Sequence, residues 1–130
     1  MSRFWIRAAA LALSLLGLGI AMILASLAFN HHRYLEHEDL LREVVSRQWT
    51  AERLTQWLKD VKGAPLVAVP RSPADLEREV SSHGGTQAAE IREKAGRWAQ
   101  VRVYAAADML YFVFFDDAEV MRDFTLVSRR

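Results

Sequence analysis

Three of the four histidines lie within the stretch 31–39, which also carries acidic side chains. If that stretch is helical, His32 and Glu36 are i,i+4 neighbours, a spacing at which an imidazole and a carboxylate can hold a divalent metal. The competing interpretation, which we favour, is a solvated polar segment that follows an apolar helix. We therefore expect no bound metal. The histidines and acids of this stretch are His31, His32, Glu36, His37, Glu38 and Asp39.

Two other groups of residues resemble parts of catalytic sites. His83-Gly84-Gly85 resembles an oxyanion-hole loop, but the sequence contains no G-x-S-x-G motif that would supply a nucleophile. A helix C-terminal turn explains these residues better. Asp116, Asp117 and Glu119 could act as paired carboxylates, yet acids are ordinary in hairpin turns. Since no phosphate loop, zinc-binding helix or dinucleotide fingerprint is present, the sequence predicts neither an enzyme nor a cofactor.

The charge distribution separates the N-terminus from the rest of the chain. The formal net charge is +1, but all 16 acidic residues and 15 of the 17 basic residues follow residue 30. The remainder of the chain is therefore nearly neutral and has no basic run, so nucleic-acid binding is not expected. The chain has no cysteine, which excludes disulfides, thiolate metal sites and a lipid-modified cysteine.

The N-terminal 30 residues predict a membrane anchor. No charged residue occurs from Ala8 to Phe29, a stretch of 22 residues. At about 1.5 Å per residue, a helix of this length spans the hydrocarbon layer of roughly 30 Å. The alternative is a cleaved signal peptide with Ser26-Leu27-Ala28 as its cleavage site. We favour the uncleaved anchor, because apolar stretches of signal peptides are only about 7–15 residues long.

Orientation and helix pairing follow from the same segment. Arg3 and Arg7 precede the apolar stretch, and long C-terminal domains are translocated largely regardless of charge. We expect a single-pass protein of the inner (cytoplasmic) membrane with its N-terminus in the cytoplasm and its C-terminal domain periplasmic or extracellular. Small side chains recur every three or four residues and could pack against another transmembrane helix. These residues are Ser14, Gly17, Ala21 and Ala25.

Helices are expected in the middle of the chain. Residues 31–63 form a juxtamembrane helical segment whose apolar face rotates near Thr50, where we expect a kink or a gentle supercoil. Ser72, Pro73 and Asp75 form a capping box that begins a helix extending to about Ser82. A further helix is expected over residues 86–95 and should be closed by Gly96.

The last third of the sequence predicts a three-stranded antiparallel meander. A four-residue loop over residues 106–109 would place Val103 opposite Phe112, and Tyr104 opposite Tyr111. One face of the sheet would then be entirely apolar and would pack against the two short helices. The register of the third strand stays open, because Arg122 and Asp123 place one charge on each face.

The opposite face of the meander mixes aromatic, apolar and charged residues and has two interpretations. The helix that begins near Thr50 could cover it with Leu54, Trp57, Leu58 and Val61, or it could bind a partner. For the second interpretation the expected partner-binding residues are Arg102, Tyr104, Tyr111, Val113 and Phe124.

These patterns together predict an α+β protein with an anchor (1–30), a juxtamembrane helical segment (31–63) and a small α+β domain (64–130). We expect a protein-protein interaction or assembly module of the cell envelope, whose partner is another envelope protein or a second copy of the chain. The alternative is a cleaved, soluble periplasmic binding or inhibitor protein.

Overall fold

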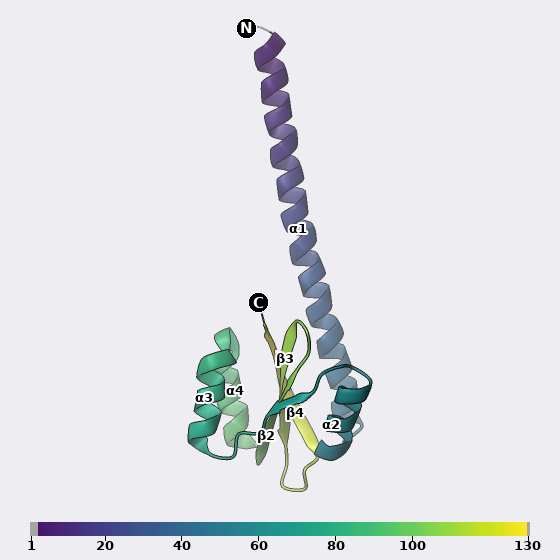
Figure 1. Ribbon diagram of the computed structural model, residues 1–130, viewed down its shortest axis with the longest axis vertical. Helices are drawn as coiled ribbons and strands as arrows, with labels where there is room; N and C mark the ends of the chain where they lie inside the picture. The colour runs from purple at the N-terminus through teal and green to yellow at the C-terminus, as the bar shows by residue number, and fades with distance from the viewer. Residues whose placement is uncertain (1–2, 130) are drawn as a thin grey trace. The chain divides into compact units, whose positions relative to one another are not determined.

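The computed structural model describes residues 3–129 and begins with helix α1, Arg3–Ser46 (Figure 1). The chain divides into two compact units at Glu36 and His37, inside α1. In the first unit every described side chain up to His32 is exposed. By length and composition α1 could cross a membrane, and no other helix among residues 3–129 could. An N-terminal signal sequence would have the same length and composition. Residues 1 and 2 of the predicted anchor lie outside the described residues.

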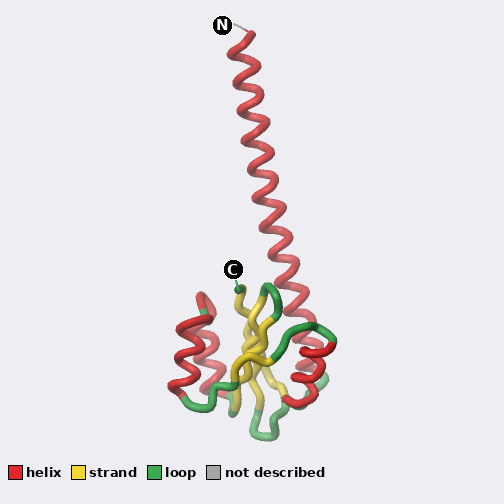
Figure 2. The backbone as a smooth tube through the Cα atoms, viewed as in Figure 1, coloured by secondary structure: helices red, strands yellow, loops and turns green. Residues whose placement is uncertain are grey.

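The second unit is built on an antiparallel sheet of four strands in the order β1-β2-β3-β4 (Figure 2). The α+β class is therefore confirmed, but the expected number of three strands is wrong. The additional strand, β1, is short and pairs with β2 across an irregularity between Leu66 and Ala68. The strands are β1 (Leu66–Ala68), β2 (Gln100–Ala105), β3 (Met109–Phe115) and β4 (Met121–Ser128).

Capping residues set the starts of two helices. α2 (Ala51–Asp60) begins after Thr50, whose hydroxyl accepts a hydrogen bond from the Arg53 backbone N–H at 3.3 Å. The expected kink near Thr50 is thus a complete break after α1. α3 (Pro73–His83) begins after Ser72 as predicted, with a 3.1 Å bond from the Asp75 N–H to the Ser72 hydroxyl.

The segment 84–97 differs from its predicted form. A short 3₁₀ helix, η1 (Gly85–Gln87), precedes α4 (Ala88–Arg97). Gly96 was expected to close this helix but lies inside it, and the helix ends where Trp98 adopts an extended conformation. Gly84 caps α3, and Gly85 has a φ of +53°, so His83-Gly84-Gly85 is a helix C-terminal turn.

The predicted pairing of β2 with β3 is confirmed at both positions named above, Val103 with Phe112 and Tyr104 with Tyr111. The register of β4 depends on a bulge. Phe114 pairs with Asp123, whereas Phe115 pairs with Met121, so Arg122 is the extra residue. A bulge changes which face the following side chains occupy, and simple alternation therefore could not assign Arg122 and Asp123.

One side of the sheet, here called the phenylalanine face, packs against α3 and α4 (Figure 1). Val80 from α3 and Ile91 from α4 are buried against it, and Leu76 and Trp98 pack at its margin. The expected apolar cover is therefore confirmed. The phenylalanine face consists of Val101, Val103, Leu110, Phe112, Phe114 and Val127.

The other side of the sheet, here called the tyrosine face, lies toward α2 (Figure 1). Leu54 and Leu58 of α2 are buried, as are Leu41 and Val44 from the end of α1. Trp57 is half-buried, and Val61 is 62% exposed. The interpretation in which α2 covers this face is therefore correct for the leucines and wrong for Val61. The tyrosine face consists of Arg102, Tyr104, Tyr111, Val113, Phe115, Phe124 and Leu126.

The start of α2 is fastened to the start of β4. The Met121 N–H donates to the Trp49 carbonyl at 2.9 Å, and the Ala51 N–H donates to the Glu119 carbonyl at 2.8 Å. Gln48 and Glu119 flank this junction and both have positive φ, at 52° and 60°. Because neither is glycine, the junction holds two residues in a backbone conformation that L side chains rarely adopt.

The outer edge of β4 is closed near its middle by side chains. Lys94 donates to the Asp123 carboxylate at 3.1 Å and to the Phe124 carbonyl at 2.6 Å. The Phe124 N–H donates to the same carboxylate at 2.7 Å. Both backbone groups of Phe124 are therefore already bonded on the edge strand of the sheet.

Candidate functional site

The five predicted partner-binding residues are largely covered in the structure. Tyr104 and Val113 are 0% exposed and Tyr111 is 2% exposed, because α2 and the end of α1 cover the tyrosine face. Their expected exposure is therefore wrong. Arg102 and Phe124 are half-buried, and their role in partner binding stays a prediction.

Tyr104 is tied to α2 through its hydroxyl group. The Thr55 hydroxyl donates to the Ala51 carbonyl at 2.7 Å, so it accepts the hydrogen bond from Tyr104, also at 2.7 Å. Burial raises the pKa of the Tyr104 hydroxyl above its ordinary value. The tyrosine therefore acts as a buried, neutral hydrogen-bond donor that connects β2 to α2.

His37 links the end of α1 to the hairpin between β2 and β3. Its Nδ1 lies 2.5 Å from the Tyr111 hydroxyl, and its Nε2 lies 3.1 Å from the Asp108 carboxylate. A histidine between a hydroxyl and a carboxylate can activate a nucleophile. Tyr111 is buried, however, so a substrate cannot reach its oxygen, and we interpret the arrangement as a structural connection.

His32 and Glu36, the residues that could hold a divalent metal, form an ion pair within the first unit. His32 Nε2 lies 3.0 Å from Glu36 Oε1, and both side chains are more than half exposed. Across residues 3–129 no group of three or more histidine or acidic side chains is placed to hold a metal.

The acids of the β3–β4 turn are used to shape the turn. The Asp116 carboxylate accepts from the Ala118 N–H at 2.9 Å, the Val120 N–H at 3.0 Å and Arg122 Nε at 2.7 Å. These bonds, with the Val120 N–H contributing most, lower the pKa of Asp116. A carboxylate engaged in this way is poorly suited to general acid–base catalysis.

The four residues predicted to pack transmembrane helices all lie in α1 and are exposed. The Ser14 hydroxyl donates to the Ala10 carbonyl at 2.9 Å, so its polar group is satisfied within the helix. A Cβ atom built on Gly17 would meet nothing within 4 Å. Pairing through Ser14, Gly17, Ala21 and Ala25 stays a prediction.

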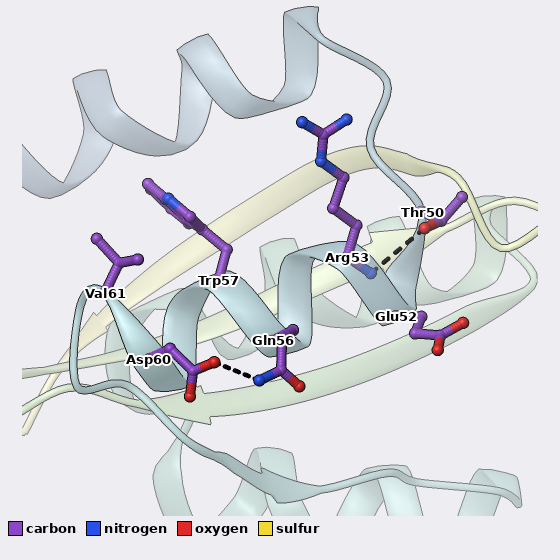
Figure 3. Close-up of a pocket in the computed structure, with 7 residues that line it drawn as sticks. All are labelled: Thr50, Glu52, Arg53, Gln56, Trp57, Asp60 and Val61. Atoms are coloured by element: carbon purple, nitrogen blue, oxygen red, sulfur yellow. Dashed lines mark hydrogen bonds between the residues drawn. The ribbon is translucent and has the colours of Figure 1, made fainter.

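The first hollow on the second unit lies along the outer surface of α2 and has a volume of about 560 Å³ (Figure 3). Trp57 packs edge-on against Trp49 with ring centroids 5.2 Å apart. Arg53 lies 4.5 Å above the Trp49 ring, and Lys62 lies 5.4 Å from the Trp57 ring. The lining residues are Thr50, Glu52, Arg53, Gln56, Trp57, Asp60 and Val61.

A second hollow, of about 470 Å³, lies where α3 begins and α4 ends, beside the start of β2. Arg92 closes one side, because its Nε and Nη2 donate to the two Glu77 carboxylate oxygens at 3.0 and 2.6 Å. This hydrogen bonding lowers the pKa of Glu77 and raises that of Arg92. Trp98 and Gln100 also line the hollow. The sequence predicted no functional role for either residue.

Neither models of protein families, nor the sequences of curated proteins, nor solved structures match this chain. A candidate function can therefore be inferred only from the arrangement of the side chains of this chain. The two hollows have mixed apolar and polar linings, as ligand and partner sites do. His37, Glu77, Arg92 and Asp116 are each bonded to structural partners.

Proposed function

We propose that this chain is a single-pass membrane protein of the cell envelope, with its N-terminus in the cytoplasm and its α+β unit outside it. The α+β unit binds another envelope protein or a second copy of the chain and has no catalytic role. Two features support this proposal. The apolar helix is exposed along its length, and the small folded unit has two hollows. The described residues of that unit contain no complete catalytic group.

The observation that carries the proposal is the exposure of the uncharged stretch from Ala8 to Phe29. Its large apolar side chains are between 50% and 69% exposed in the stretch from Leu11 to Phe29. A contiguous apolar surface of this length in water would promote association, whereas a bilayer solvates it. The backbone is helical throughout, so its hydrogen bonds are satisfied internally, as a membrane requires.

The orientation is supported by the sequence on each side of this stretch. Arg3 and Arg7 form a short basic head before it, as in a signal anchor, although Arg33, Arg42 and Arg47 follow it and balance the positive charge. The long segment follows it, and long segments are translocated largely regardless of their charge. The lack of cysteine means that the α+β unit depends on no disulfide and on no redox state of its compartment.

Membrane insertion is tested by placing an arginine in the middle of the apolar stretch. Gly17→Arg and Ala21→Arg should each cost about 2.5–3.5 kcal/mol of insertion free energy and release the chain from membranes washed at alkaline pH. Ser81→Arg, on an exposed position of α3, is the matched control and should leave fractionation unchanged. Full retention of both anchor variants after the wash would contradict a spanning helix.

Topology is tested with single cysteines, for which this chain has no background. Ser81→Cys should react with a membrane-impermeant maleimide on intact spheroplasts, whereas Ser2→Cys should react only after the membrane is permeabilised. The opposite labelling pattern would show that the α+β unit is cytoplasmic.

A second candidate function is favoured by Ser26-Leu27-Ala28, which matches a small-x-small signal-peptidase site. Cleavage there would release a soluble periplasmic binding or inhibitor protein. N-terminal sequencing of the mature protein separates the candidates, because cleavage after Ala28 would leave Phe29 as the first residue.

A further inference from the structure

We draw no further inference here: the strongest candidate, the hollow along the outer surface of α2 beside Trp57 and the exposed Val61, is an unpartnered surface, and nothing in the structure shows what covers it.

Discussion

The two faces of the sheet are covered by helices in chemically different ways. On the phenylalanine face, α3 and α4 contribute Val80 and Ile91, and the contact is almost wholly apolar. On the tyrosine face, α2 and the end of α1 add hydrogen bonds to apolar contact, through Tyr104 with Thr55 and Tyr111 with His37. Apolar contacts tolerate small displacements, whereas hydrogen bonds fix the position of a cover. The comparison indicates that the tyrosine-face cover is held in one specific position.

The largest expected effect tests whether both faces are core. Phe112→Ala and Tyr104→Ala should each lower the free energy of unfolding by about 3–5 kcal/mol, because both side chains are fully buried. Denaturant unfolding of the full chain in detergent, followed by circular dichroism, measures the loss. A Tyr104→Ala protein with nearly unchanged stability would mean that the tyrosine face is open to a partner in solution.

Removing a single hydroxyl group should have opposite effects on the two faces. Tyr104→Phe should cost about 1 kcal/mol, because it breaks the bond to Thr55. Thr125→Val should be neutral or stabilising by up to about 1 kcal/mol, because Thr125 Oγ1 is buried without a partner among the described residues. Thr125 pairs with Phe112 and so lies on the same side of the sheet as the phenylalanine face. Equal losses in the two variants would show that Thr125 also has a partner in solution.

High pH should weaken the tyrosine face selectively. Because burial raises the pKa of Tyr104, its contribution to stability is complete below the unfolded-state pKa of about 10 and is lost as pH rises through the folded-state value. Wild type should therefore lose stability above about pH 10 more steeply than Tyr104→Phe, as judged by melting temperatures measured between pH 8 and 11.5. Parallel curves for the two proteins would argue against the raised pKa.

The smallest expected effect concerns the turns that connect the covering helices α2 and α4 to the rest of the second unit. The turn before α4 uses Gly85 at positive φ, whereas the junction at α2 uses Glu119 at a similar angle. Glu119→Gly should relieve this strain and raise the free energy of unfolding by less than about 1 kcal/mol, since glycine also gains entropy in the unfolded chain. Gly85→Ala is the matched reverse change and should be destabilising. Stabilisation by Gly85→Ala would contradict the assigned turn geometry.

The sequence was sufficient where side-chain alternation and capping residues act locally. It predicted the pairing of Tyr104 with Tyr111 and the start of α3 at Pro73, because loop length and a capping box determine them. It did not predict β1, since three residues between prolines give too short an alternation to identify a strand. It left the register of β4 open because the bulge at Arg122 interrupts the alternation.

The candidate sites were harder to predict than the fold. The sequence could not decide whether α2 covers the tyrosine face, because an apolar helix face looks the same whether it packs internally or binds a partner. The bond between His37 and Tyr111 joins residues 74 positions apart, so no local spacing reveals it. The buried Trp98 Nε1 and Gln100 Oε1 have no hydrogen-bond partner among residues 3–129, which is likewise a property of tertiary packing alone.

The bonds that Lys94 and Asp123 make at the edge of β4 affect whether neighbouring copies of the chain can pair through this strand. If many copies are anchored in one bilayer, diffusion in two dimensions brings their sheets together repeatedly. An outermost strand with free backbone groups would then seed fibre-like aggregation from chain to chain. The Phe124 N–H is already bonded to the Asp123 carboxylate, and the Phe124 carbonyl is already bonded to Lys94. The row of free backbone groups along the edge of β4 is therefore interrupted at this residue. On the proposed membrane anchor, these bonds would reduce strand pairing between the sheets of neighbouring copies.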